Sequence, residues 1–309
     1  MLVGCVTTPG VDHVRINQLQ FVGSHNSYKR AMSPDHFAAL QANNPRAAAS
    51  LSYEHLPIPE QLDLGLRKLE FDVFAGDEEL EFPVGHVQVI DMNSQCPDLR
   101  SCLGQVRDWS DEHPRHVPIW ISFNAKDQQI KGLPDPRPFD SDTFARMDEV
   151  LESVLGDRLI RPQDVQELQW PKLADGRGKL ILVLDESGAK RDMYWPGWAQ
   201  RPMFTNAPEG HPAAAVMIIN DPIKEAARIT RLVKAGYLVR TRADADTQEA
   251  RSGDFTRREA AFASGAQAIS TDYYVRGNPF GTPYWVAPVI RCNPVTARRL
   301  EPDVCSVLE

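Results

Sequence analysis

The sequence predicts an α/β fold in which parallel strands close into a TIM-type barrel. Short apolar runs alternate with amphipathic helical stretches along most of the chain, a pattern typical of βαβ units and a parallel sheet. Two of these runs, 180–184 and 214–219, are wholly apolar, as strands are when a parallel sheet is covered on both faces. Seven or eight strands within 309 residues favour a closed barrel over an open sheet.

Each strand is expected where β-branched or aromatic residues form a short run between polar stretches. In chain order these runs are 19–23, 65–73, 117–123, 180–184, 214–219, 237–241 and 268–270. The first run stops at Ser24-His25-Asn26 and the fifth stops at Asn220-Asp221-Pro222. Polar residues therefore mark the points where strands end.

Helices are expected where apolar residues recur with helical spacing. These stretches are 34–40, 98–113, 140–155, 222–234 and 255–264. Asp98 gives the second helix an acidic start, and Pro222 lies in the first turn of the fourth, where a helix tolerates proline. Segment 185–212 is rich in Trp, Pro, Gly and Met without a clear period. We expect a long loop there, and such loops are often functional.

The charge balance limits the classes of partner. The chain has a formal net charge of −8 and a pI near 5.5. Because phosphate backbones need basic surface, we expect no nucleic acid partner, and the same charge disfavours strong electrostatic docking on anionic membranes. No run of about 18 apolar residues occurs, so no segment is expected to span a bilayer.

The N-terminus indicates export. Leu2-Val3-Gly4-Cys5 is similar to the end of a bacterial lipoprotein signal, in which a small residue precedes the lipidated Cys, and a chance match is the alternative. We therefore divide the chain into an exported N-terminal remnant, 1–12, and a single barrel domain, 13–309. A periplasmic, secreted or Cys5-anchored protein is expected, and we expect it to be a monomer.

The remaining cysteines also fit an oxidising compartment. Cys96 and Cys102 form one local pair and Cys292 and Cys305 another, with five and twelve residues between partners. No Cys-x-x-Cys spacing indicates a metal cluster. We expect two short-loop disulfides, and reduced thiols in a cytosolic enzyme are the alternative.

Chemically active side chains gather where the expected strands end. His25 and Asn26 follow the first strand, and Glu70 and Asp72 lie two residues apart in the second, so they share one face. Further along the chain, the ends of later strands and the loops after them carry His86, Asn124, Lys126, Arg240, Arg242, Asp272 and Tyr273. Active sites of such barrels lie at this C-terminal rim, so we expect these residues to form one site.

The residue types suit phosphoryl transfer. Oxygen ligands without cysteine suit a hard cation such as Ca²⁺ or Mg²⁺, two histidines suit proton transfer, and lysine and arginine suit a phosphate. Glu70 and Asp72 could instead form an exposed strand face, although Leu69, Phe71 and Val73 cover the opposite one. Arg240 and Arg242 could likewise be a solvated face.

Ordered motifs across nearly the whole chain resemble the phosphatidylinositol-specific phospholipase C superfamily, most closely its calcium-dependent bacterial and fungal branch. The motifs are Gly23-Ser24-His25-Asn26-Ser27-Tyr28, Leu69-Glu70-Phe71-Asp72-Val73, Gly85-His86, Asp91-Met92, Cys102-Leu103, Trp109-Ser110, Arg240-Thr241-Arg242-Ala243-Asp244, Ser264-Gly265-Ala266-Gln267 and Ser270-Thr271-Asp272-Tyr273. Each motif is weak alone, but their order is specific.

The resemblance implies a mechanism and a cofactor. His25 resembles the general base that deprotonates the inositol 2-hydroxyl, and His86 resembles the second histidine, which assists departure of the diacylglycerol oxygen. Asn26, Glu70 and Asp72 resemble ligands of Ca²⁺, with Mg²⁺ less expected. The implied partner is an inositol phospholipid or a soluble inositol phosphodiester, reached through transient membrane contact.

One position departs from the eukaryotic pattern of this family. Where those enzymes place a glutamate on the third strand as a further calcium ligand, this chain has Asn124, whose amide oxygen coordinates without adding charge. Lys126, Arg240, Arg242, Asp272 and Tyr273 are the candidates for binding phosphate and inositol.

Two other functions compete with this interpretation. A glycerophosphodiester phosphodiesterase shares the barrel and metal chemistry, but that family places His-Arg-Gly after the first strand, where this chain has His25-Asn26-Ser27. A non-catalytic protein that binds inositol lipids or glycans is the second alternative, which the presence of both histidines disfavours.

Overall fold

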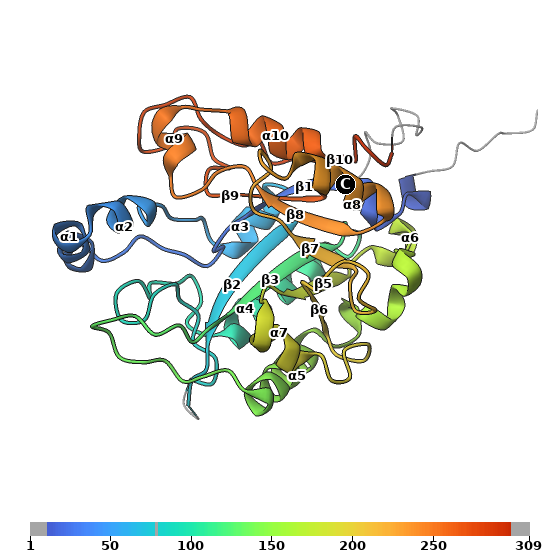
Figure 1. The fold of residues 1–309 in the computed structure, drawn as a ribbon, viewed down its shortest axis with the longest axis horizontal. Coiled ribbons are helices and arrows are strands. Elements are labelled where there is room, and N and C mark those ends of the chain that lie inside the picture. Colours follow the sequence, from blue (N-terminus) through green and yellow to red (C-terminus); the bar gives the residue numbers. More distant parts are fainter. Residues whose placement is uncertain (1–10, 78–79, 298–309) are drawn as a thin grey trace, which may run out of the picture.

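The computed structural model describes residues 11–77 and 80–297. Its strands form a parallel barrel at the centre of the molecule (Figure 1). In ring order they are β1 (Leu19–Ser24), β2 (Lys68–Phe74), β3 (Ile119–Lys126), β5 (Leu180–Leu184), β6 (Met203–Thr205), β7 (Val216–Ile218), β8 (Leu238–Arg242) and β9 (Ala268–Thr271). Consecutive members pair in parallel, and β9 pairs with β1. A single bridge from Asn206 to Val216 joins β6 to β7. The predicted barrel is confirmed.

Two short strands extend the sheet outside this ring. β4 (Leu159–Ile160) adds to β5 in parallel, and β10 (Ile290–Cys292) runs antiparallel to β1. The latter brings the end of the described chain back against the first strand, because Leu19 pairs with Cys292.

Alternate strand residues separate the barrel interior from the layer beneath the helices. Trp120, Ile181, Val183 and Phe204 belong to the apolar cluster that fills the interior. Their strand neighbours, such as Leu69, Phe71, Ile121 and Phe123, instead join a cluster with the helices α4 (Leu99–Glu112) and α5 (Ser141–Leu155). This period of two is the one expected for strands covered on both sides.

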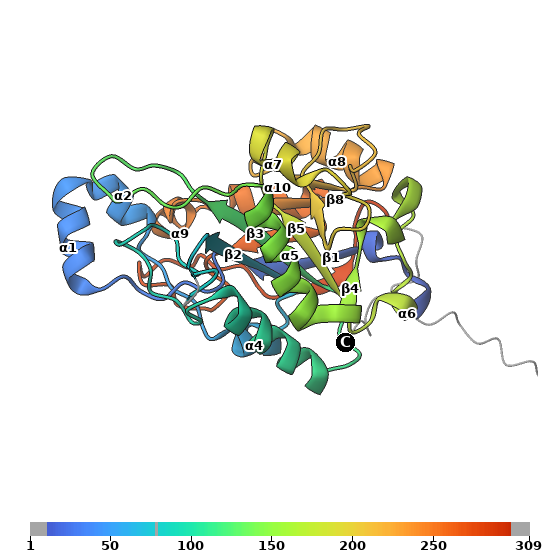
Figure 2. The same ribbon diagram turned by 90° about the horizontal axis from the view of Figure 1, so that it is seen from below.

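The helices surround the sheet, as Figure 2 shows from below. Besides α4 and α5, they are α1 (Pro34–Asn43), α2 (Pro45–Ser50), α3 (Ile58–Asp63), α6 (Leu173–Gly176), α7 (Gly188–Tyr194), α8 (Ala226–Ala235), α9 (Gln248–Ser252) and α10 (Thr256–Ser264). Short 3₁₀ turns cover Val11–His13, Ile16–Gln18, Gly156–Arg158, Pro162–Asp164 and Gln166–Leu168. None of the described helices is long and apolar enough to cross a membrane.

The helix α1 lies apart from the barrel. In both views α1 and α2, which follow β1, project at the left beyond the ends of the strands (Figures 1 and 2). No residue of α1 is buried, although the helix contains Phe37 and Leu40. Phe37 and Leu40 are half-buried, so part of each apolar side chain is accessible beside the C-terminal rim of the barrel.

The prediction of a long loop over 185–212 is wrong. This segment contains α7 and the barrel strand β6. The strand has only three residues, Met203 to Thr205, between Pro202 and Asn206. A run that short shows no period, so its neighbours in the sheet, and not its own sequence, determine its conformation.

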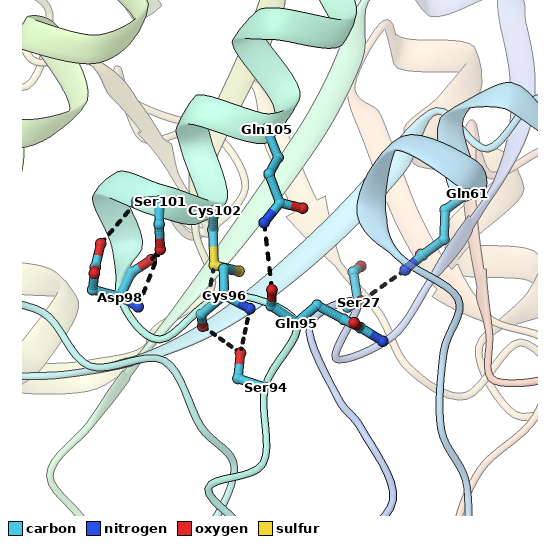
Figure 3. Close-up of a disulfide and its surroundings, with 9 residues drawn as sticks. All are labelled: Ser27, Gln61, Ser94, Gln95, Cys96, Asp98, Ser101, Cys102 and Gln105. Carbon is cyan, nitrogen blue, oxygen red and sulfur yellow. Dashed lines mark hydrogen bonds between the residues drawn. A yellow bond between two sulfur atoms is a disulfide. The ribbon is translucent and has the colours of Figure 1, made fainter.

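The expected local disulfide between Cys96 and Cys102 is confirmed (Figure 3). It joins the loop before α4 to the first turn of that helix. Asp98 caps the same turn, because its side chain accepts a hydrogen bond from the backbone N–H of Ser101 at 2.8 Å. The loop is therefore held covalently and by a helix cap. The second expected pair includes Cys305, which lies outside the described residues, as does Cys5.

We predict that Gly23→Ala destabilises the barrel. A Cβ atom at this position would lie 2.1 Å from the backbone oxygen of Lys68, which is the residue paired with Gly23 across β1 and β2. The two strands would have to separate, at a cost of about 1–3 kcal/mol or more. Urea denaturation followed by circular dichroism measures the change.

Gly104→Ala is the matched control for this substitution. Gly104 lies in α4 and a Cβ there would meet nothing within 4 Å, so alanine should leave stability unchanged or raise it by up to about 1 kcal/mol. Equal unfolding free energies for the two variants would contradict the close approach of β1 and β2.

Candidate active site

A cavity of about 340 Å³ lies where the carboxyl ends of the strands meet. It collects nine of the residues predicted from sequence, namely His25, Asn26, Glu70, Asp72, His86, Asn124, Lys126, Arg240 and Arg242. They come from the ends of β1, β2, β3 and β8 and from the loop after β2. The topology therefore brings together groups that are more than 200 residues apart in the chain.

His25 is oriented by a buried carboxylate. Its Nδ1 lies 3.1 Å from Oδ1 of Asp272, and its Nε2 lies 3.6 Å from Oε1 of Glu70. When Nδ1–H donates to Asp272, the lone pair is on Nε2, on the side of the imidazole that faces Glu70. The carboxylate thus selects the tautomer that proton abstraction requires.

The surroundings of His25 favour its neutral form. Burial and the nearby guanidinium of Arg242 lower the pKa of His25 below its usual value, although Asp272 and Glu70 oppose the shift. Burial would raise the pKa of Asp272, but the charge of His25 and hydrogen bonds from His25 and His55 hold it well below its usual range. Near neutral pH the pair is therefore a neutral imidazole beside a carboxylate.

Asp244 supports this pair from behind. Its Oδ1 accepts a hydrogen bond from the backbone N–H of Asp272 at 2.9 Å, and its Oδ2 accepts from Thr271 and Tyr284. Its backbone oxygen accepts from Nε of Arg242 at 3.1 Å. One buried residue thus fixes both the carboxylate beside His25 and the arginine on the cavity wall.

His86 lies beside a buried ion pair. Its Nδ1 is 3.4 Å from Oδ2 of Asp91, and its backbone N–H donates to the carbonyl of Asp91 at 2.9 Å. Both carboxylate oxygens of Asp91 accept from Nζ of Lys29 at 2.7 Å, and neither side chain is exposed. Although burial alone would raise it, the pKa of Asp91 is lowered by His86 and Lys29. Asp91 is therefore a carboxylate held 3.4 Å from the second histidine, whose Nδ1 makes no hydrogen bond to the described residues.

Glu70 is surrounded by cations inside the barrel. Its Oε2 accepts from Nζ of Lys68 and, at 2.9 Å, from Arg240. Burial alone would raise its pKa, but Lys68 and Arg240 hold it well below its usual range. In turn, burial lowers the pKa of Lys68 to about 8. Arg240 also donates to Ser270 and Asn220, so its guanidinium is engaged within the wall.

Asp72 and Asn124 face each other across β2 and β3. They are paired in the sheet, and Nδ2 of Asn124 donates to Oδ1 of Asp72 at 2.8 Å and approaches Oε1 of Glu70 at 3.4 Å. The second oxygen of Asp72 lies 3.0 Å from Nζ of Lys126. Each carboxylate thus has one oxygen beside a cation and the other beside the Asn124 amide.

Asn26 has an unusual backbone conformation. Its φ is +47°, in the left-handed region that few side chains occupy without support. Its Nδ2 donates to the hydroxyl of Tyr53 at 2.8 Å, which leaves the amide oxygen for other partners. The conformation is supported by Ser27, whose N–H donates to Glu70 O and whose hydroxyl accepts from Glu70 N–H.

This donor set fits a calcium ion. Glu70 and Asp72 offer carboxylate oxygens that both accept from Nδ2 of Asn124, and Asn26 and Asn124 line the same cavity with side-chain amides. Hard oxygen ligands without sulfur or imidazole are the ligands that Ca²⁺ prefers. Of these four candidate side chains, Glu70 and Asp72 carry a negative charge and Asn26 and Asn124 do not.

Tyr273 and Asp272 lie outside this cavity. Asp272 contacts His25, which lines the cavity. The hydroxyl of Tyr273 is buried without a hydrogen-bond partner among the described residues. Tyr273 packs against Phe280 and Tyr284. Both residues instead line a second hollow of about 760 Å³, whose walls include the apolar side chains of Met32, Phe37, Leu51, Leu56 and Val275.

Several residues of the site escaped the sequence analysis. Asp185, Glu186 and Lys190 line the cavity, but they begin the segment expected to be a loop. Burial raises the pKa of Asp185 to about 6 and that of Glu186 to about 7. The signal was present, because Asp185 follows a wholly apolar strand directly, in the position that identified the other rim residues.

Comparison with known proteins identifies the chain's relatives. The family model described as Ca²⁺-dependent phosphoinositide phospholipase C matches residues 14–83 and 78–294. No curated protein matches the chain.

Solved structures share the fold at low identity. A calcium-dependent phosphoinositol-specific phospholipase C from Pseudomonas sp. has a TM-score of 0.59 and 17% identity over 92% of this chain and 97% of that one. The Ca²⁺-dependent enzyme from Streptomyces antibioticus has a TM-score of 0.58 and 18% identity over 84% and 95%. The phosphatidylinositol-specific phospholipase C from Listeria monocytogenes has a TM-score of 0.56 and 14% identity over 84% and 90%.

We predict that Lys29→Met destabilises the protein by about 3–5 kcal/mol, because it leaves Asp91 as a buried charge without its cation. Urea denaturation at neutral pH measures the unfolding free energy. Lys224→Met is the control, since Lys224 pairs with Asp221 while 82% exposed and surface pairs contribute little. A Lys29 variant as stable as this control would contradict a structural role for the buried pair.

Proposed function

Because this chain belongs to the Ca²⁺-dependent phosphoinositide phospholipase C family, we propose that the cavity bearing His25 and His86 is where it cleaves an inositol phosphodiester. The observation that carries this proposal is the pairing of each histidine with its own buried carboxylate, Asp272 for His25 and Asp91 for His86. Two histidines oriented in this way on one cavity suit an acid and a base.

His25 acts as the general base. With Nδ1–H donated to Asp272, Nε2 takes the proton of the inositol 2-hydroxyl, and that oxygen attacks phosphorus. The lowered pKa of His25 keeps the imidazole neutral and able to accept a proton at neutral pH. Asp272 stabilises the imidazolium that results, as a carboxylate partner does in other histidine bases.

His86 acts as the general acid. As the bond from phosphorus to the diacylglycerol oxygen breaks, a protonated His86 donates its proton to that oxygen, and an inositol cyclic phosphate remains. Asp91 lies 3.4 Å from Nδ1, so a carboxylate stands behind the ring that gives up the proton.

Asn26, Glu70, Asp72 and Asn124 are the residues that would hold calcium. When bound, the ion lowers the pKa of the attacking hydroxyl and neutralises charge on the phosphate oxygens. Lys126 and Arg242, on opposite strands of the same cavity, supply further positive charge to the phosphate.

The apolar hollow supports a lipid substrate and transient membrane contact. It shares Asp272 with the catalytic pair and is walled by Met32, Phe37 and Leu51 from the segments around α1 and α2. An uncovered apolar region beside an active site is typical of an enzyme that works at a lipid surface. The Cys96–Cys102 disulfide supports export to an oxidising compartment.

We predict that His25→Ala and His86→Ala each lower kcat by at least about 10²- to 10⁴-fold, because each removes one proton-transfer group. The measurement is release of diacylglycerol and water-soluble inositol phosphate from phosphatidylinositol vesicles. His13→Ala is the control, since His13 lies in a 3₁₀ turn before β1, outside the cavity. Unchanged turnover in either variant would remove that histidine from the mechanism.

We predict that removal of calcium abolishes turnover. A panel of phosphatidylinositol, glycerophosphoinositol and other glycerophosphodiesters, assayed with added Ca²⁺ and with EDTA, tests substrate and metal together. The lipid should be cleaved only with Ca²⁺. Full activity after chelation would refute the metal role, and faster turnover of glycerophosphoinositol than of the lipid would favour a glycerophosphodiesterase.

A further inference from the structure

Asp185 is a carboxylate that lines the cavity and that the proposed mechanism does not use. It follows β5 directly, and its backbone N–H donates to Phe123 O at 2.8 Å. Because Phe123 is paired with Leu184, Asp185 lies next to Asn124 on the neighbouring strand, at the inner face of the rim. Within the described part of the chain, no hydrogen bond or ion pair to the Asp185 carboxylate is found.

The cations of the cavity are already engaged with other carboxylates. Lys126 lies 3.0 Å from Asp72, Arg240 lies 2.9 Å from Glu70, and Arg242 lies 3.9 Å from Asp272. Lys190 pairs with Asp127 and donates to the backbone oxygen of Ala125. A partly buried carboxylate without a hydrogen-bond donor beside it is unfavourable. We therefore expect a bound ligand to donate hydrogen bonds to Asp185.

A metal ion is not the partner that the geometry favours. Among the residues that the structure describes, no three His, Cys, Asp or Glu side chains converge closely enough to hold one ion. Asp185 therefore does not join Glu70 and Asp72 as a third carboxylate around a common centre. Hydroxyl groups remain, because each can donate to a carboxylate oxygen without adding charge.

We propose that Asp185 binds ring hydroxyls of the inositol headgroup and excludes headgroups that carry additional ring phosphates. The proposal rests on the proposed function and specifies its substrate class. A phosphate beside an unpaired carboxylate would be repelled, and the cavity of about 340 Å³ is near the lower end of ligand sites, where one ring and one phosphodiester fill most of the space.

Direct binding tests this inference without turnover. Isothermal titration calorimetry compares myo-inositol 1-phosphate with inositol 1,4,5-trisphosphate on the full-length wild type and on Asp185→Asn. The wild type should bind the monophosphate at least about tenfold more tightly, and Asp185→Asn should reduce that preference by about tenfold or more. Equal affinities in the wild type, or an unchanged preference in the variant, would overturn the proposal.

Glu186→Gln is the matched control. It removes the same charge one residue away, but Glu186 already accepts from Ala125 N–H at 2.8 Å and lies 3.6 Å from Lys190. The preference should stay within about threefold of the wild type. A loss equal to that of Asp185→Asn would show a general charge effect and overturn a specific role for Asp185.

Metal affinity separates this role from calcium binding. Terbium luminescence should give Kd values within about twofold for the wild type and Asp185→Asn, and a tenfold loss would assign Asp185 to the metal and refute the proposal. These experiments also distinguish failure of this inference from failure of the proposed function. A binding preference without cleavage of phosphatidylinositol contradicts the phospholipase alone, whereas cleavage of phosphatidylinositol 4,5-bisphosphate at an equal rate contradicts only this inference.

Discussion

The buried pair of Lys29 and Asp91 is the interaction on which the geometry of the site depends. Lys29 lies in the loop after β1, which carries His25 and Asn26, and Asp91 lies in the loop after β2, which carries His86. Nζ of Lys29 also lies 5.3 Å from the centre of the Tyr53 ring. The hydroxyl of Tyr53 accepts a hydrogen bond from Nδ2 of Asn26. One ammonium group thus fixes the relative position of both histidine loops, because neither buried charge has water to replace its partner.

The rest of the site follows the same rule of matched charges. Lys68 and Arg240 neutralise Glu70, Lys126 neutralises Asp72, and Arg242 approaches Asp272. Because the barrel interior below is apolar, each inward charge at the rim needs such a partner. The arrangement holds the oxygen ligands in place and leaves one oxygen of Glu70 and one of Asp72 beside the Asn124 amide.

Sequence reasoning succeeded where local pattern and structure coincide. The alternation of Glu70 and Asp72 predicted a shared inner face, and the polar residues after each strand predicted the rim, as with His25 and Arg242. It missed groups whose role depends on distant partners. Lys29 and Asp91 are 62 residues apart, and no periodicity links them. It also missed Asp185, although the strand 180–184 was predicted to end directly before it, because the irregular composition of 185–212 was interpreted as a loop and concealed that β6 completes the ring.

The closure of that ring has a mechanical consequence. Several paired residues join β2 to β3 and β3 to β5, whereas β6 and β7 meet at the single bridge between Asn206 and Val216. Thermal opening of a closed sheet begins where the fewest hydrogen bonds must break. β1 and β2 share the pair of Gly23 and Lys68 and two further backbone hydrogen bonds, from Arg67 N–H to Val22 O and from Ser27 N–H to Glu70 O. Opening of the barrel therefore starts on the side formed by β6 and β7, away from the extensively paired strands β2 and β3, which carry Glu70, Asp72 and Asn124.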